Sequence, residues 1–184
     1  MALAEPVPWR IATSIQEITD CFSVMKELRS NLELGDFITQ VQRQQQQSDY
    51  RLVYLQVGDW VRAVAGFRIS ESLAWGKFMY IDDLVCSSNN RSQGDGSKLF
   101  NWLVDYARAQ NCQQLTLDSG VQRFAAHRFY LRHRIEITSH HFTLKLWQPL
   151  QNKLEKLFAG ATKIGGCCGK IIAVNLLLIV QRDC

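Results

Sequence analysis

The chain has 184 residues, of which 47% are hydrophobic and 21% are charged, and its net charge is +4 at neutral pH. This length suits one domain with a sizeable core, and the composition excludes a disordered or collagen-like chain. The mild positive charge is compatible with an anionic ligand. A dedicated nucleic-acid binder would instead show a basic stripe with interleaved aromatic residues, which the chain lacks.

Targeting and cysteine patterns point to a cytoplasmic protein with no membrane partner. Residues 1–8 have neither a basic region nor an apolar region of the kind found in secretory signals. The longest apolar run, residues 171–180, falls short of the roughly 20 residues that span a bilayer. The six cysteines form no C-x-x-C pair and no Cys/His group with zinc spacing, so we expect reduced thiols and no metal site.

Hydrophobic periodicity predicts strands and helices in a mixed order. We expect strands at residues 9–12, 50–57, 60–69, 74–86, 115–118 and 135–147. We expect helices at residues 15–28, 32–46, 95–110 and 121–133. The order β-α-α-β-β-β-α-β-α-β predicts an α/β (α+β) fold, in which helices flank one mixed sheet. Residues 1–150 would form this domain, and residues 151–184 a C-terminal extension of unknown role.

The most informative segment is the polar loop after the strand that ends near Cys86. Arg91-x-x-Gly94-x-Gly96 precedes a helix, where glycines allow a tight turn and exposed backbone N–H groups favour an anion. The spacing fits neither a Walker A loop nor a dinucleotide fingerprint. A glycine-rich helix start with no ligand is the alternative.

This loop resembles the acyl-CoA signature of the GNAT superfamily of N-acetyltransferases, a resemblance that covers about residues 9–147. It implies an acyl-CoA N-acyltransferase fold with a splayed sheet and acetyl-CoA as cosubstrate. The implied coenzyme contacts are Leu84, Val85 and Cys86 on the strand, and Arg91, Gln93, Gly94, Asp95, Gly96 and Ser97 in the loop. The Asp95 side chain is expected to point to solvent, because a carboxylate beside the diphosphate would be unfavourable.

A second segment, residues 125–133, resembles the second motif of the same superfamily and is most similar to that of aminoalkylphosphonate N-acetyltransferases. The resemblance implies that Ala126 and Phe129 contact the coenzyme and that Tyr130 protonates the departing thiolate. A phenol with an ordinary pKa near 10 holds a proton at neutral pH, so the role is chemically sensible. A buried tyrosine with a purely structural hydroxyl is the alternative.

Two adjacent acids, Asp82 and Asp83, precede the coenzyme strand segment. An alkylammonium must lose a proton before it attacks a thioester, and a carboxylate is a suitable base. Side chains alternate along a strand, so only one acid should face the cleft. The resemblance nominates Asp82 as the base and Asp83 as the second choice. The alternative is that both acids form structural salt bridges. His127 and His133 on the last helix are expected at the surface. One of His140 and His141 could line the acceptor pocket or join a metal site with a carboxylate, but a structural role is expected.

These observations predict an enzyme that transfers acetyl from acetyl-CoA to a primary amine by direct attack in a ternary complex. The acceptor would be a small-molecule amine, and a homodimer is possible at the family level. Two alternatives remain open: a non-catalytic acyl-CoA-binding sensor or interaction module, and a protein N-acetyltransferase.

Overall fold

The computed structural model describes residues 9–90 and 93–146 and divides the chain into two units, residues 1–137 and 138–184. The expected domain boundary at residue 150 and the extension after it lie outside the described residues. The strands of the first unit are β1 (Trp9–Ile11), β2 (Arg51–Val57), β3 (Trp60–Ser72), β4 (Gly76–Cys86) and β5 (Gln114–Leu117). Its helices are α1 (Ile15–Leu28), α2 (Leu34–Gln47), α3 (Asp95–Ala109) and α4 (Phe124–Arg132), with a 3-10 turn at Ser88–Asn90.

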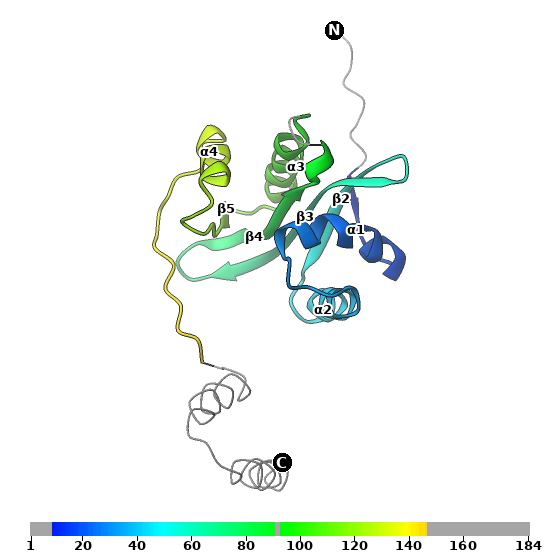
Figure 1. Ribbon diagram of the computed structural model, residues 1–184. Helices are drawn as coiled ribbons and strands as arrows, with labels where there is room; N and C mark the ends of the chain where they lie inside the picture. Colours follow the sequence, from blue (N-terminus) through cyan, green and yellow to red (C-terminus); the bar gives the residue numbers. More distant parts are fainter. Residues whose placement is uncertain (1–8, 91–92, 147–184) are drawn as a thin grey trace, which may run out of the picture. The chain divides into compact units, whose positions relative to one another are not determined.

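The strands form one mixed sheet in the order β1-β2-β3-β4-β5 (Figure 1). The first four strands are antiparallel neighbours, and β5 joins β4 in parallel after the α3 crossover. This arrangement confirms the predicted mixed sheet flanked by helices.

Helices flank both faces of the sheet (Figure 1), and each face carries a hydrophobic cluster. One cluster joins α1 and α2 to the sheet, with Ile18, Phe37 and Leu52 among its buried residues. The other joins α3 to the opposite face, with Phe67 and Leu99 among its buried residues. The sheet therefore separates an α1/α2 side from an α3/α4 side, and functional groups on β4 face one or the other.

Local sequence signals explain where the first helix begins. Ser14 is the N-cap of α1, and its side chain and that of Glu17 form a reciprocal capping box. One carboxylate oxygen of Glu17 accepts the backbone N–H groups of Thr13 and Ser14 at 3.0 and 2.9 Å. The box satisfies N–H groups that the helix itself leaves unpaired.

A β-bulge interrupts β4 where it passes the acid pair. The register with β3 shifts between Gly66, which faces Asp83, and Phe67, which faces Ile81, so Asp82 is the extra residue. Beyond this point β4 also leaves β5, because the parallel pairing ends at Ile81 and Leu117. The pairing pattern thus opens a splay between the two strands from Asp82 onward.

Every predicted helix and the first five predicted strands form, with ends shifted by a few residues. The predicted strand at residues 135–147 is wrong for the part that is described, because residues 135–146 form no strand. Apolar residues alternate there, but a strand also needs a neighbour for its backbone groups, and among the described pairings none involves this segment. Ile135 is half-buried against the α3-side cluster, but the apolar side chains after it are exposed, as in Ile137 and Phe142 at 77% and 90%. Trp147 lies outside the described residues.

Candidate functional site

The start of α3 provides the first part of the site. Gly94 is the helix N-cap and has a left-handed backbone with φ of 78°, which glycine adopts at little cost. No described side chain caps this helix end, and apart from its chain neighbours no described atom lies within 4 Å of the Cβ that another residue would add at Gly94. The first-turn N–H groups therefore remain available beside open space, in an arrangement suited to an anion.

The two sequence motifs meet next to this loop. A Cβ added at Gly96 would lie 3.4 Å from the sulfur of Cys86 and 3.7 Å from the ring of Phe129. Ser97 Oγ lies 3.0 Å from Nε2 of His133, at the end of α4. The structure thus brings the end of β4, the start of α3 and the α4 helix into contact.

His133 corrects one sequence expectation. It was expected to be exposed, but it is half-buried and its ring packs against Phe100 and Phe129, with centroid distances of 4.9 and 4.6 Å. Its bond to Ser97 ties α4 to the first turn of α3. The helical pattern gave no signal for this contact, because His133 follows the last helical residue and the partner is distant in sequence.

The β4 segment presents alternate side chains to the two sides. Leu84 and Cys86 pack against the α3-side cluster, whereas Val85 packs against the α1/α2-side cluster. On the edge that faces β5, no described strand pairs with residues 82–86. Backbone groups of Leu84 and Cys86 can therefore hydrogen-bond a ligand lying in the splay, whereas those of Val85 point toward β3, as the N–H of Ser87 does. Arg91 lies outside the described residues.

Asp95 does not point to solvent as expected. Its side chain is only 6% exposed, and its Oδ2 lies 2.6 Å from Nη2 of Arg62, at the start of β3. The same nitrogen donates to the side-chain oxygen of Gln93. The unfavourable charge foreseen from sequence is therefore compensated by a cation that no motif indicated.

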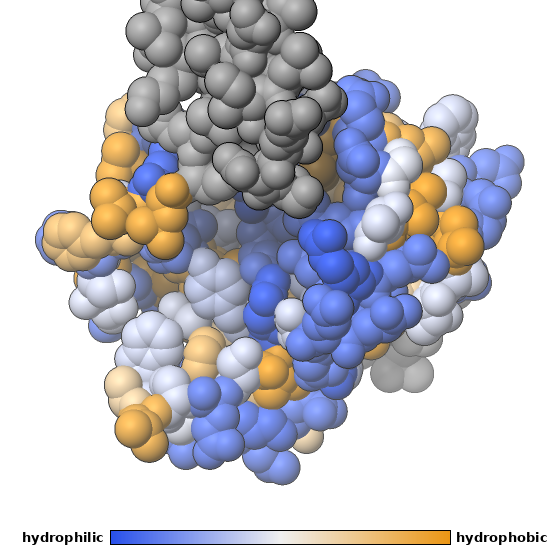
Figure 2. Space-filling view, turned by 90° about the horizontal axis from the view of Figure 1, so that it is seen from below, coloured by the Kyte–Doolittle hydropathy of each residue, from blue (hydrophilic) through white to orange (hydrophobic). Residues whose placement is uncertain are grey.

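Asp82 and Asp83 line one cavity together, which corrects the expectation that they face opposite sides of the sheet. The bulge at Asp82 changes the alternation, so both side chains lie on the α1/α2 side. The cavity has a volume of about 320 Å³. Its other described lining residues are Met25, Arg29, Leu32, Phe37, Gln40, Val41, Gln44 and Tyr50. Figure 2 looks from the α2 side and shows a largely hydrophilic face with separate apolar patches.

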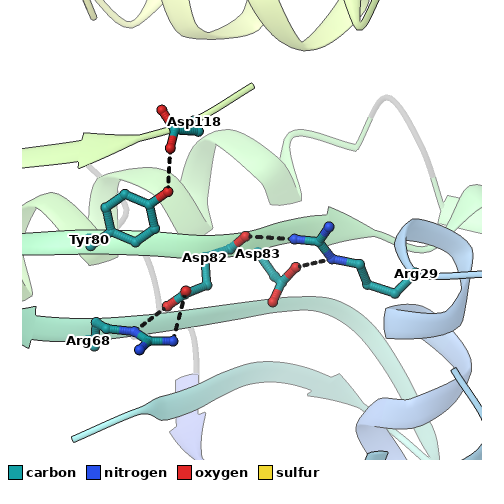
Figure 3. A network of polar contacts seen from close by, with 6 residues as sticks. All are labelled: Arg29, Arg68, Tyr80, Asp82, Asp83 and Asp118. Carbon is teal, nitrogen blue, oxygen red and sulfur yellow. Dashed lines mark hydrogen bonds and ion pairs between the residues drawn. The ribbon is translucent and has the colours of Figure 1, made fainter. Parts of the chain in front are cut away.

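Each acid has its own arginine partner (Figure 3). Nε and Nη2 of Arg68 donate to the two carboxylate oxygens of Asp82, both at 2.9 Å. Nε of Arg29 donates to Asp83 at 2.7 Å, and its Nη2 donates to the backbone oxygen of Asp82 at 3.1 Å. Burial nevertheless raises the pKa of Asp82 above its usual value, against the opposing effect of Arg68.

Tyr80 extends this polar network across the splay. Its hydroxyl donates to Asp118 at 2.7 Å, so a side chain of β4 reaches the residue that follows β5 (Figure 3). Burial and the bond to Asp118 both raise the pKa of the Tyr80 hydroxyl. This phenol therefore stays protonated at neutral pH and bridges the two strands where they diverge.

Tyr50 is a site residue that sequence reasoning missed. It is buried, it lines the cavity, and its ring occupies space that only a glycine at position 66 leaves open. A Cβ at Gly66 would lie 2.0 Å from the Tyr50 hydroxyl oxygen. Burial, with the charges of Asp83 and Asp82 nearby, raises the pKa of this hydroxyl. The signal in the sequence was a glycine inside a strand, which often marks a close approach.

The predicted acid Tyr130 lies in α4 beside Phe129, with ring centroids 5.4 Å apart. It is half-buried, as is Ala126 on the same helix. Burial raises the pKa of the Tyr130 hydroxyl, although the positive charge of Arg123 acts in the other direction. The described contacts connect this helix to the glycine loop through Phe129 and His133, and not to the acid pair.

Comparisons with known proteins bear on this arrangement of loop, splay and second motif. The sequence model of the Acetyltransferase (GNAT) family matches residues 15–134. The chain belongs to the GNAT acetyltransferase family. It is 33% identical over 118 residues to the uncharacterized N-acetyltransferase YhdJ of Bacillus subtilis (strain 168), across 64% of this chain and 83% of that one.

Solved structures agree on the fold of this acetyltransferase. A GNAT family acetyltransferase of Staphylococcus aureus matches with a TM-score of 0.64 and 18% identity, over 75% of this chain and 97% of that one. Glucosamine-6-phosphate N-acetyltransferase of Arabidopsis thaliana matches with a TM-score of 0.60 and 18% identity, over 75% and 98%. A structure titled as a transcriptional regulator of Bacillus halodurans matches at 0.63 and 20%, over 77% and 100%.

Within the described part of this acetyltransferase, no helix has the length and apolarity to cross a membrane. No group of three or more potential metal ligands comes together there either. Family membership makes the protein an acyltransferase, specifically an N-acetyltransferase, and GNAT acetyltransferases use acetyl-CoA as cosubstrate.

Proposed function

We propose that this enzyme transfers the acetyl group of acetyl-CoA to a small primary amine by direct attack in a ternary complex. The observation that supports this most is the cavity on the α1/α2 side of β4, where Asp82 and Asp83 meet at the bulge. The cavity adjoins the strand segment that runs into the glycine loop. Acetyl-CoA and the acceptor amine can therefore approach β4 from its two sides.

The residues present fit the coenzyme at the start of α3. A diphosphate accepts hydrogen bonds from several N–H groups, and the first turn of α3 offers uncapped ones next to open space at Gly94. The contributing main-chain segment is Gln93, Gly94, Asp95, Gly96 and Ser97. The pantetheine arm would follow the free edge of β4 at Leu84, Val85 and Cys86, with Ala126 and Phe129 on the other side.

The chemistry needs two proton transfers. The neutral amine nitrogen attacks the thioester carbonyl carbon, and the carbon–sulfur bond breaks when the tetrahedral intermediate collapses. Asp82 accepts the proton that the ammonium loses, a role that its raised pKa favours. Tyr130 donates a proton to the thiolate, and its burial keeps the phenol protonated for that step. The backbone N–H near Val85 polarises the carbonyl.

The acceptor is limited by the size and charge of the cavity. A volume of about 320 Å³ suits a small molecule. Because Arg29 in the lining and Arg68 beside it each pair with one aspartate, the described charges at the cavity leave no excess of negative charge for a polyamine. Apolar side chains of α1 and α2, such as Met25 and Phe37, would contact a hydrocarbon part of the acceptor. We therefore infer a small monoamine with an apolar portion.

A thiol-release assay with acetyl-CoA and a panel of amines tests the proposal. The panel contains alkyl and arylalkyl monoamines, aminoalkylphosphonates, polyamines and peptides with free N-termini. We expect turnover with monoamines, and loss of at least about 10²-fold in kcat for Tyr130→Phe, as for removal of a general acid. Aminoalkylphosphonates belong in the panel because the second motif is similar to that of their N-acetyltransferases.

Three results would contradict the proposal. Turnover confined to peptides would indicate a protein N-acetyltransferase. Tight coenzyme binding without thiol release across the panel would indicate a sensor module. Unchanged turnover in a folded Tyr130→Phe variant would remove Tyr130 from the mechanism.

A further inference from the structure

An acidic residue stands where this enzyme should receive a diphosphate. Asp95 is the first residue of α3, and its side chain is buried at 6% exposure. A carboxylate in the first turn is favourable for the helix itself. It also competes with any second anion at the same N–H groups, and burial reduces the screening of that repulsion by water.

Arg62 meets this carboxylate from a different strand. Its Nη2 lies 2.6 Å from Oδ2 of Asp95 and also donates to the side chain of Gln93. The backbone oxygen of Arg62 accepts from the N–H of Ser87 at 2.8 Å, which fixes the start of β3 against the end of β4. One guanidinium thus holds both the residue before Gly94 and the residue after it.

The pair depends on charge more than on a closed hydrogen-bond network. Within the described part of the chain, Nε of Arg62 is buried and has no hydrogen-bond partner. Lys98 lies further away, with its Nζ 3.9 Å from the other carboxylate oxygen and a side chain that is 55% exposed. Among the residues that the structure describes, Arg62 is therefore the nearest counter-charge of Asp95.

Resting on the proposed function, we propose that Arg62 is a positioning residue for the coenzyme diphosphate. It cancels the charge of Asp95 and holds the Gln93–Ser97 backbone, so that the N–H groups of α3 stay available to the ligand. The two partners must then have opposite effects on binding. Without Arg62, Asp95 repels the diphosphate, whereas without the Asp95 charge, Arg62 becomes an unpaired cation that attracts it.

A double-mutant cycle measures this relation through the Kd of coenzyme A by calorimetry, which requires no amine. We expect Arg62→Met to weaken binding about tenfold or more, an effect typical of a close uncompensated charge. Asp95→Asn should bind coenzyme A as tightly as the wild type or more tightly. The double variant should return to within about threefold of the wild type, because the two charges are removed together.

Two further measurements separate this role from a loss of folding. Thermal unfolding of each variant reports stability, which both single substitutions can lower. Acetylpantetheine lacks the diphosphate, so its kcat/KM should change little in folded Arg62→Met. Arg108→Met is the matched control, because Arg108 pairs with Asp105 at 3.2 Å on the same helix, but both side chains are 75% exposed. It should leave the Kd unchanged.

Parallel weakening by Arg62→Met and Asp95→Asn would overturn the proposal, and so would equal losses with coenzyme A and acetylpantetheine. Unchanged binding in folded Arg62→Met would do the same. A wild-type protein that binds no coenzyme A would contradict the proposed function itself. The calorimetric cycle therefore distinguishes failure of the inference from failure of the function.

Discussion

Asp82 and Asp83 share a cavity, but their carboxylates are held differently. Arg68 contacts both oxygens of Asp82, whereas Arg29 contacts one oxygen of Asp83. Burial raises the pKa of Asp82 above its usual value. A carboxylate that releases its proton less readily than usual accepts one from an ammonium more readily, so Asp82 is better suited to be the base.

Asp82→Asn should lower kcat by about 10²-fold or more, since a positioned base contributes at least that much. In the wild type, kcat should fall as the pH drops through the pKa of Asp82, because the protonated acid cannot accept a proton. The raised pKa of Asp82 means that this acidic limb, the fall of kcat at low pH, lies at a higher pH than the titration of an ordinary aspartate would give. The residual activity of the variant should lack the limb in a pH–rate profile.

Asp83→Asn is the matched control for this experiment. It alters the neighbouring carboxylate in the same cavity and leaves the bidentate contact between Arg68 and Asp82 in place. We expect it to retain the acidic limb and most of kcat. A profile in which the limb disappears from Asp83→Asn and persists in Asp82→Asn would assign the base to Asp83 instead.

The sequence indicated the site residues that belong to continuous motifs and missed those that reach it through tertiary contacts. The glycine loop and the acid pair were visible because their residues are adjacent in the chain. Arg62 and Tyr50 were invisible, because each matters through a partner on another element: Asp95 for Arg62, and Gly66 for Tyr50. Hydrophobic periodicity within a strand does not show which of its side chains contacts a loop that is distant in sequence.

At the scale of elements, the capping box at the start of α1 ties a local sequence signal to stability. Hydrogen bonds from the backbone of Thr13 and Ser14 lower the pKa of Glu17 to about 2. A depressed folded-state pKa stabilises the protein above the unfolded value of 4.5, and this contribution is lost as the pH falls toward 2. The helix also supplies Met25 and Arg29 to the cavity.

Glu17→Ala should therefore destabilise the fold at neutral pH by about 0.5–2 kcal/mol, the range measured for loss of a helix cap. The difference from the wild type should shrink when chemical denaturation is repeated at progressively lower pH, because protonation removes the same interaction. Asp20→Ala is the control, because Asp20 is a half-buried acid of the same helix that takes no part in the capping box. A difference that is constant from pH 7 to pH 3 would contradict the role assigned to the Glu17 charge.

Element prediction succeeded where a segment has its own periodicity and its own partner. The helix patterns of α1 and α3 each have a buried face, so sequence and structure agree. Alternation of apolar residues wrongly predicted a strand at residues 135–146, because a strand also needs a neighbouring backbone to hydrogen-bond with. The bulge in β4 was also beyond prediction, since no glycine or proline marks Asp82 as the extra residue.

At the scale of the first unit, the sheet has a hydrophobic cluster on each face, and coenzyme should bind where one of them ends. Cys86 and Phe129 pack at the border of the α3-side cluster and lie next to Gly96. A ligand between them would connect β4, α3 and α4. Binding at this junction should therefore stabilise the folded unit as a whole.

Coenzyme A at 100 times its Kd should add about 2.7 kcal/mol to the free energy of unfolding. For a unit of this size that corresponds to a rise in Tm of roughly 5–10 °C. Thermal unfolding monitored by circular dichroism measures the shift, and pantetheine without the diphosphate is the control that should produce little. A Tm that is independent of coenzyme A would place the ligand elsewhere or show that it does not bind.

The extra residue in β4 also affects how this sequence can be aligned and edited. Upstream of Asp82, Met79 and Ile81 contact the α3-side core, and downstream Leu84 and Cys86 do so, so odd positions give way to even ones. Deleting one codon there would restore unbroken alternation while removing one acid from the cavity. A gap-free alignment with a relative that lacks the insertion would pair inward side chains with outward ones along half the strand.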